Sequence, residues 1–130
     1  MEFFKIVKAD SSEELIQKTF SLENLERMSN QMFLLAKPQK NNASIGTVWG
    51  EFTLTLSAIK GGLRFALQEC PNALTWSITT GYPHAPERIV IHLTLNRQQI
   101  KQDLLEEIDE FLNDLEQCIL QVFSGFVEIA

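Results

Sequence analysis

Hydrophobic and polar residues alternate strictly along four short segments between residues 52 and 95. A period of two places successive side chains on opposite faces of a β-strand, so each segment is predicted to be a half-buried strand. The connections between the segments are rich in glycine, proline and asparagine, which are typical of turns between antiparallel strands. The pattern therefore predicts a four-stranded antiparallel meander whose apolar face consists of Phe52, Leu54, Leu56, Leu63, Phe65, Leu67, Leu74, Trp76, Ile78, Ile89, Ile91, Leu93 and Leu95.

After the last predicted strand, apolar residues recur at spacings of three and four from Ile100 to Val122. This spacing places them on one face of a helix, with acidic residues on the opposite face. Asn96, with Gln99 three positions further on, is typical of a helix N-cap. We therefore expect a long amphipathic helix over residues 98–124 that packs on the apolar face of the sheet.

Before the meander, the sequence predicts a helical pair. Ser11 and Glu14 form a capping box, in which each side chain accepts a hydrogen bond from a backbone N–H near the other, so a helix is expected from about residue 12. Apolar residues continue at helical spacing to about Ala36. One bent helix and two short helices both fit this pattern, and Ser21 as a second N-cap favours two. The polar stretch around residues 38–44 is expected to end the unit.

Residues 2–7 are predicted to form a short strand. Together these elements predict one α+β domain over residues 1–130: an N-terminal strand, a helical pair, a four-stranded antiparallel meander and a long C-terminal amphipathic helix packed on one sheet face. This order of elements resembles the helix-grip arrangement of START-like lipid and hormone binders. The resemblance implies a space for a ligand between the sheet and the last helix.

The composition is that of an ordinary globular protein, with 45% hydrophobic and 22% charged residues. The net charge is −6, and it is concentrated in residues 98–130, where eight acidic residues face one lysine. A binder of nucleic acid or of an anionic membrane surface needs a cluster of basic residues, which this chain lacks. We therefore expect no nucleic-acid partner and no membrane partner.

The N-terminal residues contain lysines and acids at short intervals, so they do not form the apolar core of a secretory signal. No apolar run approaches the roughly 18 residues of a membrane span. The two cysteines, Cys70 and Cys118, lie too far apart in sequence for a metal knuckle and are too few for a disulfide framework. These observations predict a cytoplasmic protein with no metal site and no cofactor.

The polar face of the predicted meander carries two residues that could bind a ligand, Arg64 and His92. In a meander, the strand with Thr75, Ser77 and Thr79 lies between the strands that carry them. The arrangement is consistent with a shallow site for an anionic small molecule. It is equally consistent with a solvated face, or with a face buried against the helical pair or a second subunit, and we favour one of these structural roles.

The segment GYPHAPER, residues 81–88, connects the last two predicted strands. His84 could act as a general base or ligand there, oriented by Glu87, while Arg88 holds an anion. The simpler interpretation is a stiff connecting loop whose prolines and glycine fix its path. Trp49, at the start of the first meander strand, is either a buried edge residue or an exposed anchor for a partner.

The common catalytic motifs are absent from the sequence. Three functions are consistent with these observations. The leading interpretation is a small non-enzymatic protein-interaction or assembly module whose partner is another protein or a second copy, as a homodimer. The first alternative is a binder of a small apolar molecule, in a pocket between the sheet and the C-terminal helix lined by Phe52, Phe65, Trp76 and Phe111. The second alternative is an enzyme that uses His84 or His92.

Overall fold

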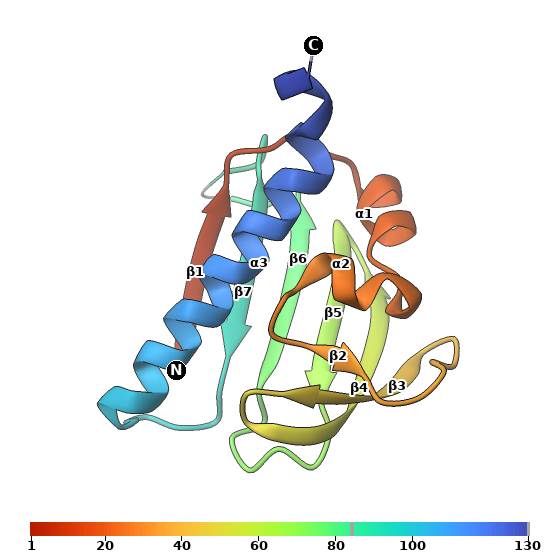
Figure 1. Cartoon of the computed structure of the whole chain (residues 1–130). Coiled ribbons are helices and arrows are strands. Elements are labelled where there is room, and N and C mark those ends of the chain that lie inside the picture. Colours follow the sequence, from red (N-terminus) through yellow and green to blue (C-terminus); the bar gives the residue numbers. More distant parts are fainter. Residues whose placement is uncertain (84, 130) are drawn as a thin grey trace.

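A curved antiparallel sheet and one long helix form the framework of the molecule (Figure 1). The computed structural model describes residues 1–83 and 85–129, with side chains through residue 123. The seven strands lie in the order β1-β7-β6-β5-β4-β3-β2. The strands are β1 (Glu2–Val7), β2 (Phe33–Leu34), β3 (Asn42–Thr47), β4 (Gly50–Ile59), β5 (Gly62–Leu67), β6 (Thr75–Thr80) and β7 (Ile89–Thr94), and the helices are α1 (Glu13–Thr19), the 3-10 helix η1 (Leu22–Asn24), α2 (Leu25–Met28) and α3 (Gln102–Ile129).

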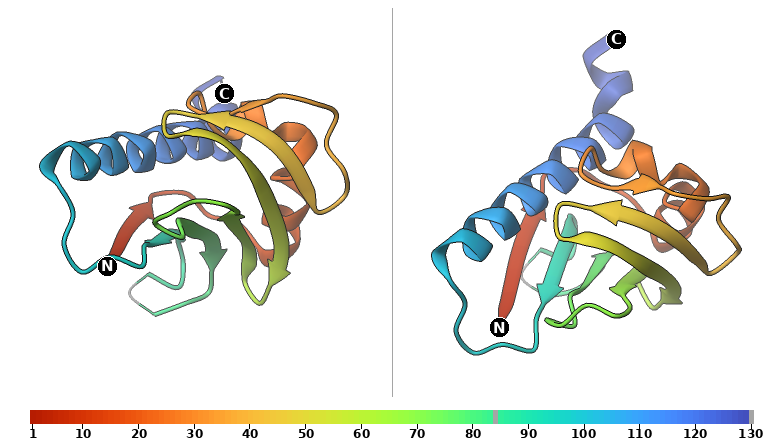
Figure 2. Two further views of the ribbon diagram at one scale, coloured as in Figure 1. Left: turned by 90° about the horizontal axis from the view of Figure 1, so that it is seen from below. Right: turned by 60° about the horizontal axis from the view of Figure 1, so that its bottom comes forward.

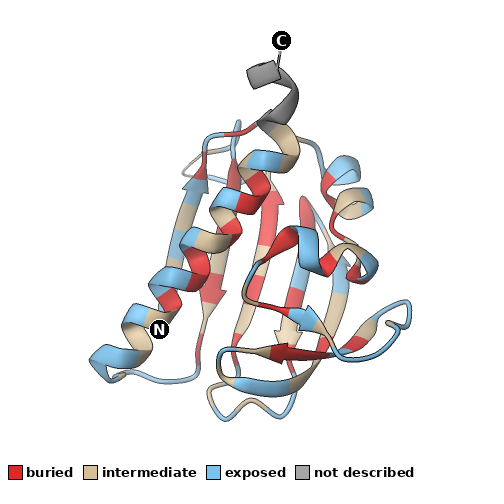
Figure 3. Cartoon of the chain, viewed as in Figure 1, coloured by how far each residue is buried: buried red, intermediate tan, exposed pale blue. Residues whose placement is uncertain are grey.

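Strands β4 to β7 form the meander that the alternating pattern predicts. The register aligns residues of the predicted apolar face with one another, because Phe65 pairs with Trp76 and Trp76 pairs with Leu93. All three of these side chains are buried, and Figure 3 shows that the buried positions of the sheet lie beneath α3. The face assignment made from the sequence is therefore confirmed.

The prediction of four strands in the sheet is wrong, because the sheet has seven. β1 is the predicted N-terminal strand, and it adds to the sheet by pairing with β7. β3 lies in the polar stretch that we expected to be a connection. Its asparagine, serine and glycine do not favour a strand by themselves, but every residue of β3 pairs with β4. β2 then pairs with β3 through two residues.

The N-terminal helices are shorter than the sequence predicts. The N-cap of α1 is Ser12, whose hydroxyl accepts a hydrogen bond from the Leu15 N–H at 3.1 Å, rather than Ser11. The chain breaks between α1 and η1 at Ser21, so the two-helix alternative is the correct one. α2 ends at Met28 instead of continuing to residue 36, because Ser29 is extended and α3 holds Ser29 and Asn30 through the contacts described below.

The last helix begins at Gln102, four residues later than we expected. Asn96 does not cap it, because Asn96 lies six residues before the first helical residue. The Asn96 N–H instead donates to the carbonyl of Asn72 in the β5–β6 connection at 2.9 Å. Arg97 Nε donates to the Asn72 side chain at 3.0 Å. These contacts fix the segment before α3 to the sheet. The expected apolar stripe of α3 is confirmed by the burial of Ile108, Phe111, Leu112, Leu115 and Ile119.

The sheet curves around α3, so that β3 and β1 lie on either side of the helix (Figure 2). We call the face of the sheet toward α3 the inner face, and the opposite one the outer face. α1 packs at the β5 and β6 side of the sheet, and α2 packs beside α3. In the part of the chain that the structure describes, no helix combines the length and the apolar character that crossing a membrane requires.

Candidate functional site

Aromatic side chains meet where α3 crosses the inner face of the sheet. Phe111 of α3 contacts two tryptophans edge to face, with ring centroids 5.4 Å from Trp49 and 5.0 Å from Trp76. Phe65 stacks on the other side of Trp76 at 5.5 Å. We call these four residues the aromatic cluster. The cluster joins β5, β6, the β3–β4 turn and α3, and its geometry is that of favourable aromatic packing.

Both tryptophans of the aromatic cluster lack a hydrogen-bond acceptor. Trp76 is 1% exposed, and the Nε1 atoms of Trp49 and Trp76 are both buried with no partner among the described residues. A buried N–H without an acceptor costs about 1–3 kcal/mol, and native structures satisfy most such groups with protein or water. The described residues therefore leave two buried indole donors without an acceptor next to one phenylalanine.

A surface hollow of about 350 Å³ lies beside the aromatic cluster, between the β3–β4 turn and α3. Thr47 and Val48 line it on one side, directly before Trp49, and Glu107 and Glu110 line it on the helix side. Phe33 completes the rim and is 52% exposed. The hollow therefore lies beside the chain segments that carry Trp49 and Phe111.

Two sets of polar contacts hold α3 in place over the sheet. Lys5 of β1 forms an ion pair with Glu116 at 3.8 Å. Asp114 accepts three hydrogen bonds from the segment after α2: Ser29 Oγ donates at 2.6 Å, and the Asn30 N–H donates to both carboxylate oxygens at 3.0 and 3.2 Å. We call this second set the Asp114 clamp. It ties the middle of α3 to the α2–β2 segment and so defines one side of the space between helix and sheet.

The thiol of Cys118 lies one turn after Asp114 on α3. Burial raises the pKa of Cys118, and the negative charge of Asp114 raises it further, while a contact with Asn30 acts in the opposite direction. Cys70 is half-buried, and neither cysteine is in a disulfide. A raised pKa keeps Cys118 protonated and unreactive at neutral pH.

This environment predicts slow alkylation of Cys118. We expect iodoacetamide at pH 8 to modify Cys118 more slowly than Cys70, because Cys118 is the more buried thiol and its raised pKa leaves less thiolate. The Cys118 rate should rise at a higher pH than that of an ordinary thiol. Asp114→Asn removes one cause of the raised pKa and should move the rise to lower pH. Peptide mass spectrometry measures both sites, and equal rates at Cys70 and Cys118 would contradict the assignment.

On the outer face, the structure brings Arg64 and His92 into one row across the sheet. Arg64 pairs with Ser77, and Ser77 pairs with His92. The row continues to Phe4, since β1 pairs with β7. Neighbouring strands are about 4.8 Å apart, so the Cα atoms of Arg64 and His92 are separated by roughly 10 Å. We call Arg64, Ser77, His92 and Phe4 the outer row.

The imidazole of His92 has two partners from β1. Its ring stacks on the ring of Phe4, with centroids 4.3 Å apart and planes 1° from parallel. Its Nε2 atom lies 3.1 Å from a carboxylate oxygen of Glu2. Neither contact follows from the meander, because both depend on the pairing of β1 with β7. The adjacent phenylalanines Phe3 and Phe4 are the sequence signal for them, because neighbours on a strand lie on opposite faces.

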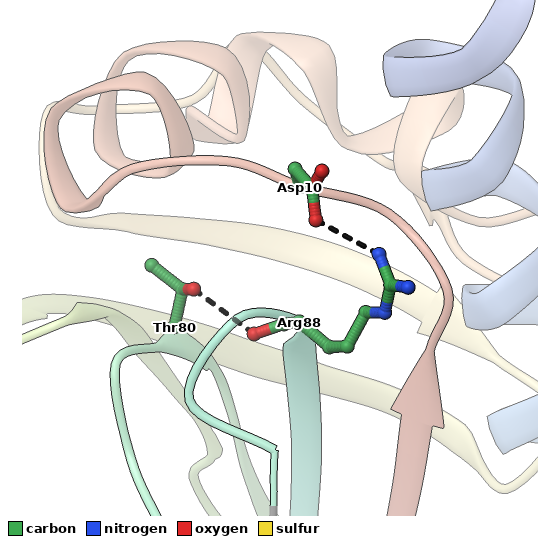
Figure 4. Close-up of polar contacts among 3 residues, drawn as sticks. All are labelled: Asp10, Thr80 and Arg88. Atoms are coloured by element: carbon green, nitrogen blue, oxygen red, sulfur yellow. Dashed lines mark hydrogen bonds and ion pairs between the residues drawn. The ribbon is translucent and has the colours of Figure 1, made fainter.

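The structure describes two of the three predicted site residues of the GYPHAPER loop, Glu87 and Arg88. Arg88 donates to the Asp10 carboxylate at 2.9 Å, and its carbonyl accepts from Thr80 Oγ1 at 2.9 Å (Figure 4). Glu87 is exposed and makes no hydrogen bond or ion pair with the described residues. His84 lies outside the described residues. Arg88 therefore fastens the loop to the segment after β1.

Trp49 is half-buried and contacts Phe111, so the structure agrees with the buried-edge interpretation. Sequence patterns did not reveal the contact, because nothing local to Trp49 indicates which residue of α3 lies above it. In the part of the chain with described side chains, no group of three histidine, cysteine, aspartate or glutamate side chains is arranged to hold a metal ion.

Comparison with known proteins gives a likeness of fold. No protein-family model matches the chain, and no curated protein matches it in sequence. Among solved structures, a START superfamily protein from Mycobacterium smegmatis is similar over 97% of both chains, with a TM-score of 0.60 and 13% identity. At this identity the likeness shows a START-like fold, and the order of elements agrees with the helix-grip arrangement noted in the sequence.

This likeness corrects the leading functional interpretation. We expected a protein-interaction or assembly module that forms a homodimer. The similar structure is a START superfamily protein across nearly the whole chain, which favours the small-molecule alternative over an assembly role. The functional prediction was wrong because small size, acidity and a polar sheet face are common to assembly modules and small-molecule binders. None of these features indicates whether a ligand fits between the last helix and the sheet.

Proposed function

We propose that this protein binds a small, mainly apolar molecule that carries a hydrogen-bond acceptor, in the space between the inner face of the sheet and α3. The observation that supports the proposal most directly is the pair of buried indole N–H groups of Trp49 and Trp76 without acceptors. A ligand oxygen placed between them would satisfy one or both donors. Such a site matches the usual composition of ligand pockets, in which apolar walls surround a few polar groups.

The aromatic cluster provides the apolar walls of this site. Phe111 contacts both tryptophans, so a ligand must displace its ring or the ring of Trp49 to reach both N–H groups. Trp49 lies in the short turn between β3 and β4, beside the hollow lined by Val48 and Glu107. Movement of this turn and of Phe111 is the simplest opening, because it leaves the meander unchanged.

The START-like fold supports the same location, since the helix-grip arrangement of lipid and hormone binders places a ligand between the sheet and the last helix. The acidic rim of the hollow, with Glu107 and Glu110, adds a restriction on the ligand. Two carboxylates disfavour the approach of an anion. We therefore propose a neutral ligand, with an oxygen such as that of a ketone, ester or ether as acceptor.

The two tryptophans allow a direct test by NMR, because the chain contains two indole N–H groups in total. The ¹⁵N-labelled protein is titrated with 2-acetylnaphthalene and, separately, with 2-ethylnaphthalene, which has the same rings but no carbonyl. We expect the ketone to bind about three- to tenfold more tightly, as one additional net hydrogen bond allows. At least one indole signal should move to lower field with the ketone.

Single replacements identify the donors and control for shape. Trp49→Phe and Trp76→Phe each remove one indole signal and one N–H group, while they keep an aromatic ring at the position. The variant that loses the preference for the ketone identifies the donor that binds it. Equal affinity of the wild-type protein for both compounds, or unchanged indole signals at saturation, would count against the proposal and favour buried water as the acceptor.

A further inference from the structure

The outer face of the sheet carries a second hollow, on the opposite side from the proposed ligand space. It has a volume of about 380 Å³, and its walls include Phe4, Ile59, Tyr82 and Val90. A smaller hollow of about 230 Å³ adjoins it, shares Ser77 and His92 with it and extends to Arg64. The two hollows therefore follow the outer row from the aromatic end at Phe4 to the cationic end at Arg64.

The wall formed by Tyr82 is fixed in position. Its hydroxyl donates to the carbonyl of Lys60 at 2.6 Å, at the tip of the β4–β5 hairpin. The Tyr82 ring lies directly against Gly61, where a Cβ atom would come within 2.6 Å of a ring carbon, and Gly61 has a φ of +90°. From the other side, Gln17 of α1 donates to two carbonyls of the same hairpin. The hollow is thus built from well-anchored elements.

The floor of the hollow presents hydroxyl groups that have no partner. Thr79 is 6% exposed, and its hydroxyl makes no hydrogen bond with the described residues. The hydroxyl of Ser77, in both hollows, is also without a partner in the described part of the chain. Polar groups in such positions generally bond to water or to a ligand. The hydroxyl groups of Ser77 and Thr79 lie between the apolar walls and the guanidinium of Arg64.

The charges along the row determine which ligand fits. Arg64 is exposed and forms no ion pair with any described carboxylate. The Glu2 carboxylate, which lies near the other end of the outer row, pairs with His92. An anionic group is therefore attracted at the Arg64 end, where the Ser77 hydroxyl can also donate to it. The flat, apolar part of the same molecule fits the Ile59 and Val90 end.

We infer that the outer hollow is a binding site for a small planar aromatic carboxylate. The carboxylate contacts Arg64 and Ser77, and the rings lie over Val90 between Ile59 and Phe4. This site has the opposite charge preference from the proposed inner site, whose rim is acidic. We therefore expect different ligands at the two sites.

The test uses sodium 2-naphthoate as the probe and the backbone amide signals of the ¹⁵N-labelled full chain as the readout. We expect the signals of Ser77, Thr79 and His92 to move while the two indole signals stay in place. Arg64→Gln should weaken binding about fivefold, as the loss of an exposed ion pair allows. Ser77→Ala should weaken it about threefold by the loss of a hydrogen bond to the carboxylate.

A matched variant separates local contact from overall charge. Arg27→Gln changes the net charge by the same amount, at an exposed arginine of α2 that forms no ion pair with the described residues. We expect it to bind 2-naphthoate like the wild type. Equal weakening in both arginine variants, or 2-naphthoate shifts confined to the indole signals, would overturn the inference. Equally strong outer-face shifts with neutral 2-acetylnaphthalene would overturn it too. The indole signals report the inner site, so a failure of the outer site and a failure of the inner site can be told apart.

Discussion

Phe111→Ala lowers the free energy of unfolding by about 3–5 kcal/mol, the range for a large aromatic residue removed from a packed core. The ring is 1% exposed and contacts both Trp49 and Trp76, so its loss leaves a space that three separate chain segments would have to move to fill. Urea unfolding followed by far-UV circular dichroism measures the change, because this signal does not depend on the fluorescence of the neighbouring tryptophans.

Phe33→Ala is the matched control for Phe111→Ala. Phe33 is also a phenylalanine, but it is 52% exposed at the rim of the hollow, so we expect its loss to cost about 1 kcal/mol or less. If both variants lost the same stability, α3 would not be packed on the sheet through Phe111. In that case the walls of the proposed inner site would also need a different assignment.

Asp114→Ala is expected to lower the free energy of unfolding by roughly 2–3 kcal/mol. The replacement removes the charged acceptor of three hydrogen bonds, and hydrogen bonds to charged groups contribute more than neutral ones. Ser29 is 1% exposed, so its hydroxyl cannot turn to bulk water. The same unfolding experiment measures this loss.

Asp109→Ala is the control for the Asp114 clamp. Asp109 is an exposed aspartate of the same helix and makes no hydrogen bond or ion pair with the described residues, so this replacement should change stability by no more than about 0.5 kcal/mol. Both variants change helix propensity and net charge in the same way, and the difference between them isolates the clamp. A difference near zero would show that the Asp114 clamp does not contribute to stability.

The inner face of the sheet could be predicted because its evidence is local. Strict alternation assigned Phe65, Trp76 and Leu93 to one face, and the structure buries all three. β3 could not be found in this way. Its residues are those of a turn, and it becomes a strand only because β4 presents an edge with which it pairs. The start of α3 was missed for a similar reason, since Asn72 binds the residue that resembles an N-cap.

The candidate sites could also be predicted only where the evidence for them is local. The sequence placed Arg64, Ser77 and His92 together because the order of strands in a meander sets which residues are neighbours. It did not indicate Phe4 as the end of that row, since this requires the pairing of β1 with β7. Asp114 was grouped with the solvated acids of the last helix. Its partners lie on a segment 84 and 85 positions earlier, and no local pattern connects the two.

The pairing of β1 with β7 also has a consequence for how the chain folds. The contact between Glu2 and His92 joins residues 90 positions apart, so β1 can take its place in the sheet only after the whole meander has been synthesised. Closing so long a loop is entropically costly, and folds with many distant contacts fold slowly. We expect the β4–β7 meander to form first on the ribosome, and the first-made strand to be the last to join it.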